Sequence, residues 1–304
     1  MAVVMETLLA LITVAGAAAE GAVGEAASET AQASRSVGLV DLPLIIGVAV
    51  FAVWAVRSRG VRSLRFAPVR RTRITLLTPF ALMGVWLMAA SVSLHLVQPL
   101  VRDSQAWQYE LTTYLALSGV LLVMIALTLL WARRSFVRGL AGLGLRLGVR
   151  RTGRDFAWAI VNLVAAYPVV LVGVALVMWL GRLYVGGDFR FEENEGLTAI
   201  RENPGPYARA VLLAFTILIV PVWEELLFRG MFQSAITALT RHPWVGIITA
   251  SIPFAVLHPP MHIPAMLVLS CCMGYAYERS GSLVRSILVH MIFNAVNVVG
   301  MLSG

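Results

Sequence analysis

Long apolar stretches recur along this chain, and they constrain its fold more than any other feature. A membrane-spanning helix needs about 20 predominantly apolar residues, and inside a bilayer the backbone must satisfy its own hydrogen bonds, which favours helices. Most of the stretches have the length of a helix. Eight candidate spans follow one another, at 40–56, 74–98, 111–131, 156–180, 208–239, 244–258, 264–277 and 283–302.

The residues before these spans differ in character. Residues 2–19 are largely apolar, and 20–38 are polar and rich in Ala, Glu and Ser. The apolar part resembles a cleaved secretory signal that lacks its positive n-region, and an uncleaved extra helix is the alternative. We therefore expect an all-α, polytopic membrane helical bundle with about eight transmembrane helices, or nine if the N-terminal segment is retained.

Composition supports a multi-pass protein of the cell membrane, with membrane lipid as its surroundings. Charged residues are 13% of the chain, whereas a soluble domain carries about 25%. The net charge of +8 comes from arginines that cluster between apolar spans, which is typical of membrane topology and not of nucleic-acid binding. The two cysteines, Cys271 and Cys272, adjoin inside an apolar stretch, so no disulfide framework or CxxC metal site is indicated.

Two loops hold most of the arginines. The loops 57–73 and 133–154 carry seven each, so the positive-inside rule places both in the cytoplasm. The loops 99–110 and 181–207 then lie outside, and the second of them is acidic. Within the second basic loop, residues 135–149 form either an amphipathic helix on the membrane surface or an ordinary basic loop.

Three charged residues interrupt the apolar span 208–239. A charge near the bilayer centre costs roughly 2.5–3.5 kcal/mol, so Glu224, Glu225 and Arg229 must be paired, protonated or used. Glu225 and Arg229 are four residues apart and share a helical face, which predicts a structural ion pair. Glu224 points about 100° away, so it is the candidate general base. Pro221 is expected to bend the helix just before the carboxylates.

Two later spans contribute imidazoles. Phe254 and His258 are four apart on one helical face, and Pro259 and Pro260 are expected to end that helix right after the histidine. His290 and Asn294 share a face of the last span in the same way. Three helices can thus bring a carboxylate, two imidazoles and an amide toward one point. Of the remaining histidines, His95 and His242 are interpreted as structural. His262 is a secondary candidate for the site.

The three motifs resemble those of a known family. EELLFR (224–229), FAVLH (254–258) and HMIFN (290–294) are similar to the EExxxR, FxxxH and HxxxN motifs of the CAAX protease and bacteriocin-processing family, also called the type II CAAX prenyl endopeptidase family. They occur in the family's order, each on its own apolar segment. The resemblance covers about 208–300, and it implies an intramembrane endopeptidase with an all-helical core.

The resemblance also implies roles for individual residues. Glu224 would activate water with the assistance of His258, and His290 with Asn294 would stabilise the oxyanion of the tetrahedral intermediate. Structural support of the site would come from Glu225, Arg229 and Phe254. The implied substrate is a peptide or a lipidated protein at the membrane. Prenyl-CAAX cleavage is one activity of the family, and peptide maturation and bacteriocin self-immunity are others.

Metal dependence stays open at this stage. Two histidines and a glutamate are a donor set that zinc accepts, and the ligands would be Glu224, His258 and His290. Metal-free catalysis without a cofactor is favoured, since the chain has no HExxH motif and an asparagine beside the second histidine suits an oxyanion site. Two other functions compete with the protease: a proton-coupled transporter and a non-catalytic membrane scaffold. A proton relay does not require a doubled glutamate or a His–Asn pair four residues apart, whereas a scaffold would keep the motifs for stability.

The expected domain organisation has three parts. A signal-like or extra N-terminal segment with a polar linker covers 1–39. Transmembrane helices with the two Arg-rich loops cover 40–207. The catalytic helical core covers 208–304.

Overall fold

A computed structural model describes residues 41–57, 64, 67–68, 72–102, 104–186, 189–190, 195–202 and 205–303. The signal-like segment 1–39 lies outside these ranges, as do several arginines of the 57–73 loop and acidic residues of the 181–207 loop. Within the described ranges the regular elements are helices, with one isolated bridge between Thr72 and Phe136. The predicted all-helical class is confirmed for this part of the chain.

The helices follow the apolar spans closely. In chain order they are α2 (Asp41–Arg57), α3 (Leu77–Val97), η2 (Gln98–Leu100), α4 (Ala106–Ser135), α5 (Gly139–Leu143), α6 (Val149–Tyr184), α7 (Glu195–Glu202), α8 (Pro206–Ala214), η3 (Phe215–Ile219), α9 (Val220–Glu225), η4 (Leu226–Gln233), α10 (Ser234–Thr240), α11 (Pro243–Val256), η5 (Pro260–His262), α12 (Ile263–Ser280) and α13 (Leu283–Ser303).

Within the described ranges, five helical stretches are long and apolar enough to cross a membrane, which points to a membrane protein. They are Leu77–Leu100, Trp107–Ser135, Val149–Tyr184, Pro206–Thr240 and Leu283–Leu302. The apolar helices Leu44–Arg57 and Pro243–Val256 are shorter. Every predicted span therefore coincides with a helix, while the predicted total of eight crossings stays a prediction.

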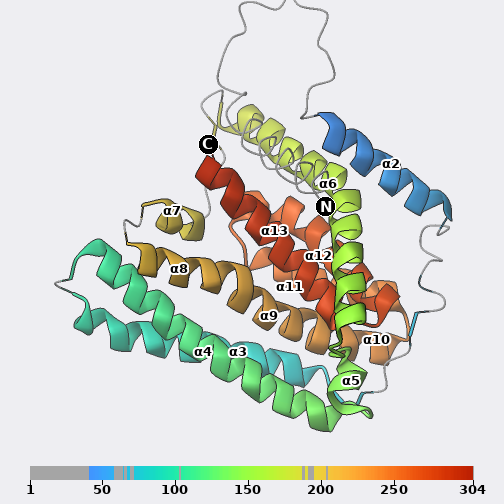
Figure 1. Cartoon of the computed structure of the whole chain (residues 1–304), viewed down its shortest axis with the longest axis horizontal. Helices are drawn as coiled ribbons and strands as arrows, with labels where there is room; N and C mark the ends of the chain where they lie inside the picture. Colours follow the sequence, from blue (N-terminus) through green and yellow to red (C-terminus); the bar gives the residue numbers. More distant parts are fainter. Residues whose placement is uncertain are drawn as a thin grey trace, which may run out of the picture.

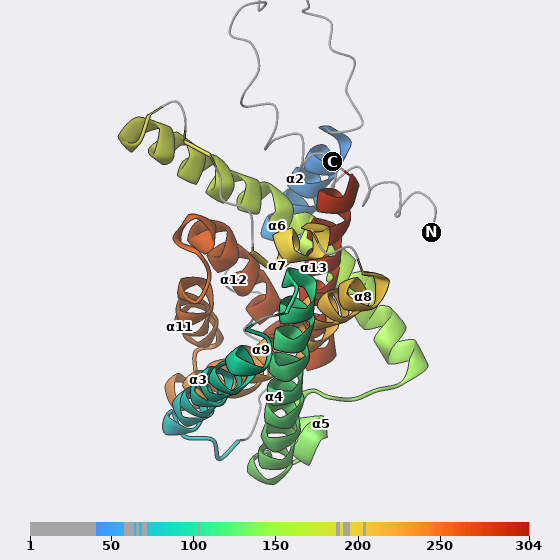
Figure 2. The same ribbon diagram turned by 90° about the vertical axis from the view of Figure 1, so that its left-hand side faces the viewer.

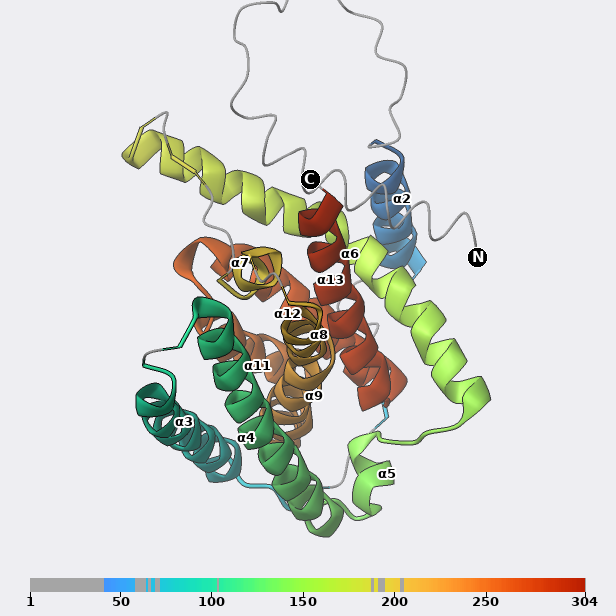
Figure 3. The same ribbon diagram turned by 60° about the vertical axis from the view of Figure 1, so that its left-hand side comes forward.

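The helices form a bundle with the motif-bearing elements in its middle (Figure 1). α3 and α4 lie side by side at one edge, and α2 packs against α6 at the other (Figure 3). α6 runs along both α12 and α13, and its C-terminal end extends beyond them (Figure 2). It changes direction along its length, which fits the proline inside it, Pro168.

The span that carries the glutamates is not a regular α-helix. η3 and η4 are π-helical, so α9 lies between two widened turns. Pro221 is the second residue of α9, two positions after the last residue of η3. A proline has no amide hydrogen for the carbonyl four residues earlier, and a widened turn accommodates this loss. Such π segments frequently occur at functional sites.

Two local predictions need correction. α11 ends at Val256, two residues before His258, and Leu257 closes it with a 3.2 Å bond to the Pro253 carbonyl. His258 therefore lies in the link between α11 and η5, not on the helix itself. Between residues 135 and 149 there is no long amphipathic helix, because the helical part is limited to the five residues of α5.

Candidate functional site

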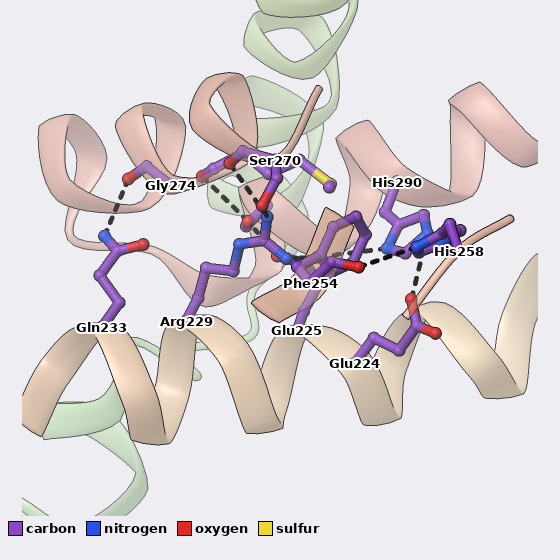
Figure 4. A network of polar contacts seen from close by, with 11 residues as sticks. Glu224, Glu225, Arg229, Gln233, Phe254, His258, Ser270, Gly274 and His290 are labelled. Atoms are coloured by element: carbon purple, nitrogen blue, oxygen red, sulfur yellow. Dashed lines mark hydrogen bonds and ion pairs between the residues drawn. The ribbon is translucent and has the colours of Figure 1, made fainter. Parts of the chain in front are cut away.

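Glu225 is the centre of a buried polar network, with 0% exposure. Arg229 Nη1 donates to its Oε1 at 2.6 Å, so the predicted ion pair is present. The Ser286 hydroxyl donates to the other oxygen, Oε2. His290 Nδ1 lies 3.1 Å from Oε1. This carboxylate thus has three donors, from two different helical segments, and its charge is fully matched (Figure 4).

Arg229 ties the glutamate segment to two other helices. It is 1% exposed, and its Nη2 donates to the backbone oxygen of Ser270 at 3.0 Å and to the Ser270 hydroxyl at 2.6 Å. Its guanidinium also lies over the Phe254 ring, 4.7 Å from the centroid. The planar fork of an arginine is suited to several partners at once. Arg229 therefore fixes η4 against both α12 and α11.

Glu224 has a different environment from its neighbour. Its side chain is 18% exposed, and the nearest charged partner among the described residues is His290, with Nε2 at 3.7 Å from Oε2. That separation is too long for a hydrogen bond, and Oε2 has no hydrogen-bond partner within the described chain. Glu224 is thus the carboxylate that the network leaves unsatisfied, as the helical geometry predicted.

His290 lies between the two carboxylates. Its Nδ1 faces Glu225 and its Nε2 faces Glu224. Because an ionised carboxylate only accepts hydrogen bonds, the short contact to Glu225 places a hydrogen on Nδ1. The Nε2 atom is then directed at Glu224. Glu225 thus orients the buried His290 side chain so that its Nε2 atom faces Glu224.

His258 is oriented by the backbone of its own segment. Its Nδ1 lies 2.8 Å from the Phe254 carbonyl oxygen, which accepts only, so Nδ1 carries the hydrogen and Nε2 carries a lone pair in the neutral ring. The Phe254 ring packs against His258 at 4.9 Å and against His290 at 5.8 Å between centroids. Phe254 therefore packs against both imidazoles, which Figure 4 shows at the Glu224 end of the network.

Asn294 makes a single described side-chain contact. Its Nδ2 donates to the backbone oxygen of Thr216 at 2.8 Å, within η3. An amide nitrogen carries two hydrogens, so one remains for another acceptor. The contacts of the described residues thus join Glu224, Glu225 and His290 directly, and they attach His258 through Phe254 and Asn294 through η3.

Several network residues were not predicted from the sequence. Ser286 and Ser270 bind the central ion pair, and Gln233 Nε2 donates to the Gly274 backbone oxygen and to Glu278 Oε1, at 3.0 Å each. Their signal is a spacing of four residues that extends the first and third motifs and recurs on α12. The three rows are Glu225–Arg229–Gln233, Ser270–Gly274–Glu278 and Ser286–His290–Asn294.

The donors do not converge as a metal site. Within the described residues there is no group of three or more His, Cys, Asp or Glu side chains placed to hold a metal ion. The set that the sequence left open for zinc, namely Glu224, His258 and His290, is thus not assembled as a ligand shell.

The comparisons with known proteins agree with the motifs. Residues 206–296 match the family model described as Type II CAAX prenyl endopeptidase Rce1-like. This range contains all three motifs and most of the polar network. No curated protein and no solved structure matches the chain. Residues 206–296 of this membrane protein are therefore similar to the Rce1-like type II CAAX prenyl endopeptidases, and this similarity points to a CAAX-type protease.

Proposed function

We propose that the protein is an intramembrane endopeptidase, which hydrolyses a peptide bond in a prenylated or other membrane-associated peptide substrate at the cell membrane. One observation carries the mechanism. Of two adjacent glutamates, the buried Glu225 is saturated by Arg229, Ser286 and His290, while the partly exposed Glu224 keeps an unsatisfied oxygen beside an imidazole. The family match supports the reaction class.

Glu224 is the proposed general base. Its carboxylate takes a proton from a water molecule, and the water oxygen attacks the carbonyl carbon of the scissile bond. His258 assists by accepting a hydrogen bond from that water through Nε2, the nitrogen that its contact with Phe254 leaves unprotonated. When the carbon–nitrogen bond breaks, Glu224 returns the proton to the leaving amine. No step requires a metal ion.

His290 and Asn294 are the proposed oxyanion donors. Asn294 has one N–H group that Thr216 does not use. His290 donates from Nε2 when both ring nitrogens are protonated, with the Glu225 carboxylate as the counter-charge at Nδ1. Donors aimed at a developing negative charge in a dry site are worth about 2.7–4 kcal/mol each. Both side chains come from α13, so one helix supplies the oxyanion site.

The test uses the full chain in lipid nanodiscs, with a quenched fluorogenic farnesylated CAAX peptide as the probe and its unprenylated form for comparison. Glu224→Gln is expected to lower kcat about 10²–10⁴-fold without a change in the unfolding temperature. His258→Ala is expected to lower kcat as well. Folded Glu224→Gln and His258→Ala proteins that keep full turnover would rule out the proposed catalytic roles of Glu224 and His258.

The adjacent glutamate is the matched control. Glu225→Gln leaves Arg229 buried with a weaker partner, and breaking a buried pair costs about 3–5 kcal/mol. We therefore expect this variant to lose thermal stability, in contrast to Glu224→Gln. A wild-type protein that cleaves neither peptide but, after reconstitution into sealed lipid vesicles, moves protons across their membrane in a Glu224-dependent way would favour the transporter instead.

A further inference from the structure

The first turn of α13 is bonded to a carboxylate that lies outside the matched domain. Asp155 belongs to α6 and is 1% exposed. The Ser282 hydroxyl donates to its Oδ2 at 2.6 Å, and Arg285 donates to its Oδ1 from Nη2 at 2.9 Å and from Nε at 3.2 Å. Both oxygens of Asp155 are thus occupied by donors from the beginning of α13.

This attachment lies next to the catalytic row. Ser286 follows Arg285 directly, and His290 and Asn294 come after it at intervals of four residues. A helix is rigid over two turns, with a rise of 1.5 Å per residue. A shift or rotation of its first turn would therefore move all three side chains together, away from Glu224, Glu225 and Thr216.

The turn before α13 is held from the same side. Leu283 N donates to the Gly144 backbone oxygen at 3.2 Å, and the Tyr277 hydroxyl donates to the Leu143 backbone oxygen at 2.9 Å. These two bonds come from the end of α5. Together with Asp155 near the start of α6, they fasten the connection between α12 and α13. Neither α5 nor α6 belongs to residues 206–296.

We propose that Asp155 is a positioning residue of the active site, which acts through α13 to hold His290 between Glu224 and Glu225. A part of the chain without any catalytic motif would in this way set the geometry of the oxyanion donors. For its kinetic consequence the inference rests on the proposed peptidase function. The placement of α13 can be measured whether or not the protein is a peptidase.

The alternative is an ion pair that serves stability alone, and a double substitution separates the two roles. Asp155→Leu leaves Arg285 without its partner, which is strongly destabilising, whereas replacing both members of a buried pair with apolar residues is often neutral. In Asp155→Leu with Arg285→Met we therefore expect the unfolding temperature to recover. The single and the double variant both lack the hydrogen bonds from Ser282 and Arg285 to Asp155.

The kinetics then decide. For the nanodisc-embedded protein with the farnesylated peptide, we expect kcat to fall about tenfold to a hundredfold in both the single and the double variant, with KM unchanged, since a misplacement of about 1 Å has effects of this size. A double variant that regains wild-type kcat together with its stability would overturn the proposal. So would a single variant with normal kcat.

A contact elsewhere in the bundle provides the control. Trp54 Nε1 donates to the Tyr275 hydroxyl at 2.8 Å, which joins α2 to α12 without touching α13. Trp54→Phe removes this bond between helices, and we expect it to leave kcat at the wild-type value. An equal loss of kcat in Trp54→Phe would mean that any loosened helix contact slows the reaction, and it would overturn the specific role of Asp155.

Hydrogen exchange distinguishes failure of this inference from failure of the proposed function. The amides of 283–290 should exchange faster in the double variant than in the wild type, in the absence of any substrate. Unchanged exchange in this segment would overturn the positioning role whatever the peptide assay gives. Faster exchange with a wild type that cleaves nothing would reject the peptidase and keep the attachment of α13 to Asp155.

Discussion

At the scale of single residues, two neighbouring glutamates have opposite environments. Glu225 has donors on both oxygens, and Glu224 has an unsatisfied oxygen. Successive helical residues point about 100° apart, so only Glu225 shares a face with Arg229. This division was predictable from the sequence. The further donors Ser286 and His290 were not, because the spacing of residues within one helix does not identify its neighbours in space.

Ser286 should matter for stability more than a typical buried hydroxyl. Its Oγ contacts Glu225 Oε2 and the Met273 backbone oxygen, the latter at 3.0 Å. Hydrogen bonds to charged groups contribute about 1.5–3 kcal/mol. We expect Ser286→Ala to lower the free energy of unfolding by that amount, as measured by reversible denaturation of the purified protein in mixed micelles.

Thr128→Val is the control substitution for Ser286→Ala. The Thr128 hydroxyl is fully buried in α4, and its Oγ1 has no hydrogen-bond partner in the described chain. Thr128→Val replaces it with an apolar group of the same shape, which can be neutral or stabilising when no partner is lost. If Ser286→Ala lowers the free energy of unfolding no more than Thr128→Val does, the contribution of the Ser286–Glu225 bond has been overestimated.

At the scale of elements, the sequence predicted which side chains share a helical face better than where helices end. Phe254 and His258 contact each other as expected, although α11 stops at Val256. The π segments were not predictable, because a widened turn is selected by packing against other helices and has no local signature. α6 begins at Val149 and not near 156, since its first turns carry Arg150, Arg151 and Arg154 and so do not register as apolar.

The end of α5 depends on a glycine. Gly144 has φ of +97°, and a Cβ placed on it would lie 2.8 Å from the Gly281 backbone oxygen and 2.8 Å from Leu283 N. A non-glycine residue in such a backbone conformation costs about 1–3 kcal/mol, and backbone atoms cannot move aside as a flexible side chain can. We expect Gly144→Ala to lower the unfolding temperature and to reduce peptide cleavage, because the turn before α13 is displaced.

Gly148 is the matched control in the same loop. Its φ of 168° is ordinary extended backbone, and a Cβ would meet no atom within 4 Å. Surface substitutions of this kind usually change stability by less than about 0.5 kcal/mol. Equal thermal scans for Gly144→Ala and Gly148→Ala would contradict the close approach of the two loops.

At the scale of the whole molecule, α4 and α6 complete the hydrophobic core of the segment that matches the Rce1-like family model. One hydrophobic cluster combines Leu121 of α4 and Leu163 of α6 with Trp223, Phe254 and Leu269 from the matched range. Helices in lipid associate through close packing and not through a hydrophobic driving force. The length of the apolar stretches therefore predicted the helices, and it left their neighbours in space undetermined.

Contacts between loops also bear on the predicted orientation. Arg73 N donates to the Ser135 backbone oxygen at 2.9 Å, and Leu283 N to that of Gly144. The described ends of both Arg-rich loops and the turn before α13 therefore lie at one end of the bundle. A single end that gathers the basic loops is what the positive-inside rule requires of a cytoplasmic face.

Cysteine labelling tests which side that end faces. In a background with Cys271→Ala and Cys272→Ala, we introduce Val137→Cys in the second basic loop or Leu100→Cys at the end of η2, two positions that are exposed. A membrane-impermeant maleimide should label Leu100→Cys in intact cells and Val137→Cys only after permeabilisation, because arginine-rich loops are retained in the cytoplasm. The reverse pattern would invert the topology, and it would place the α12–α13 turn and Asp155 at the outer surface.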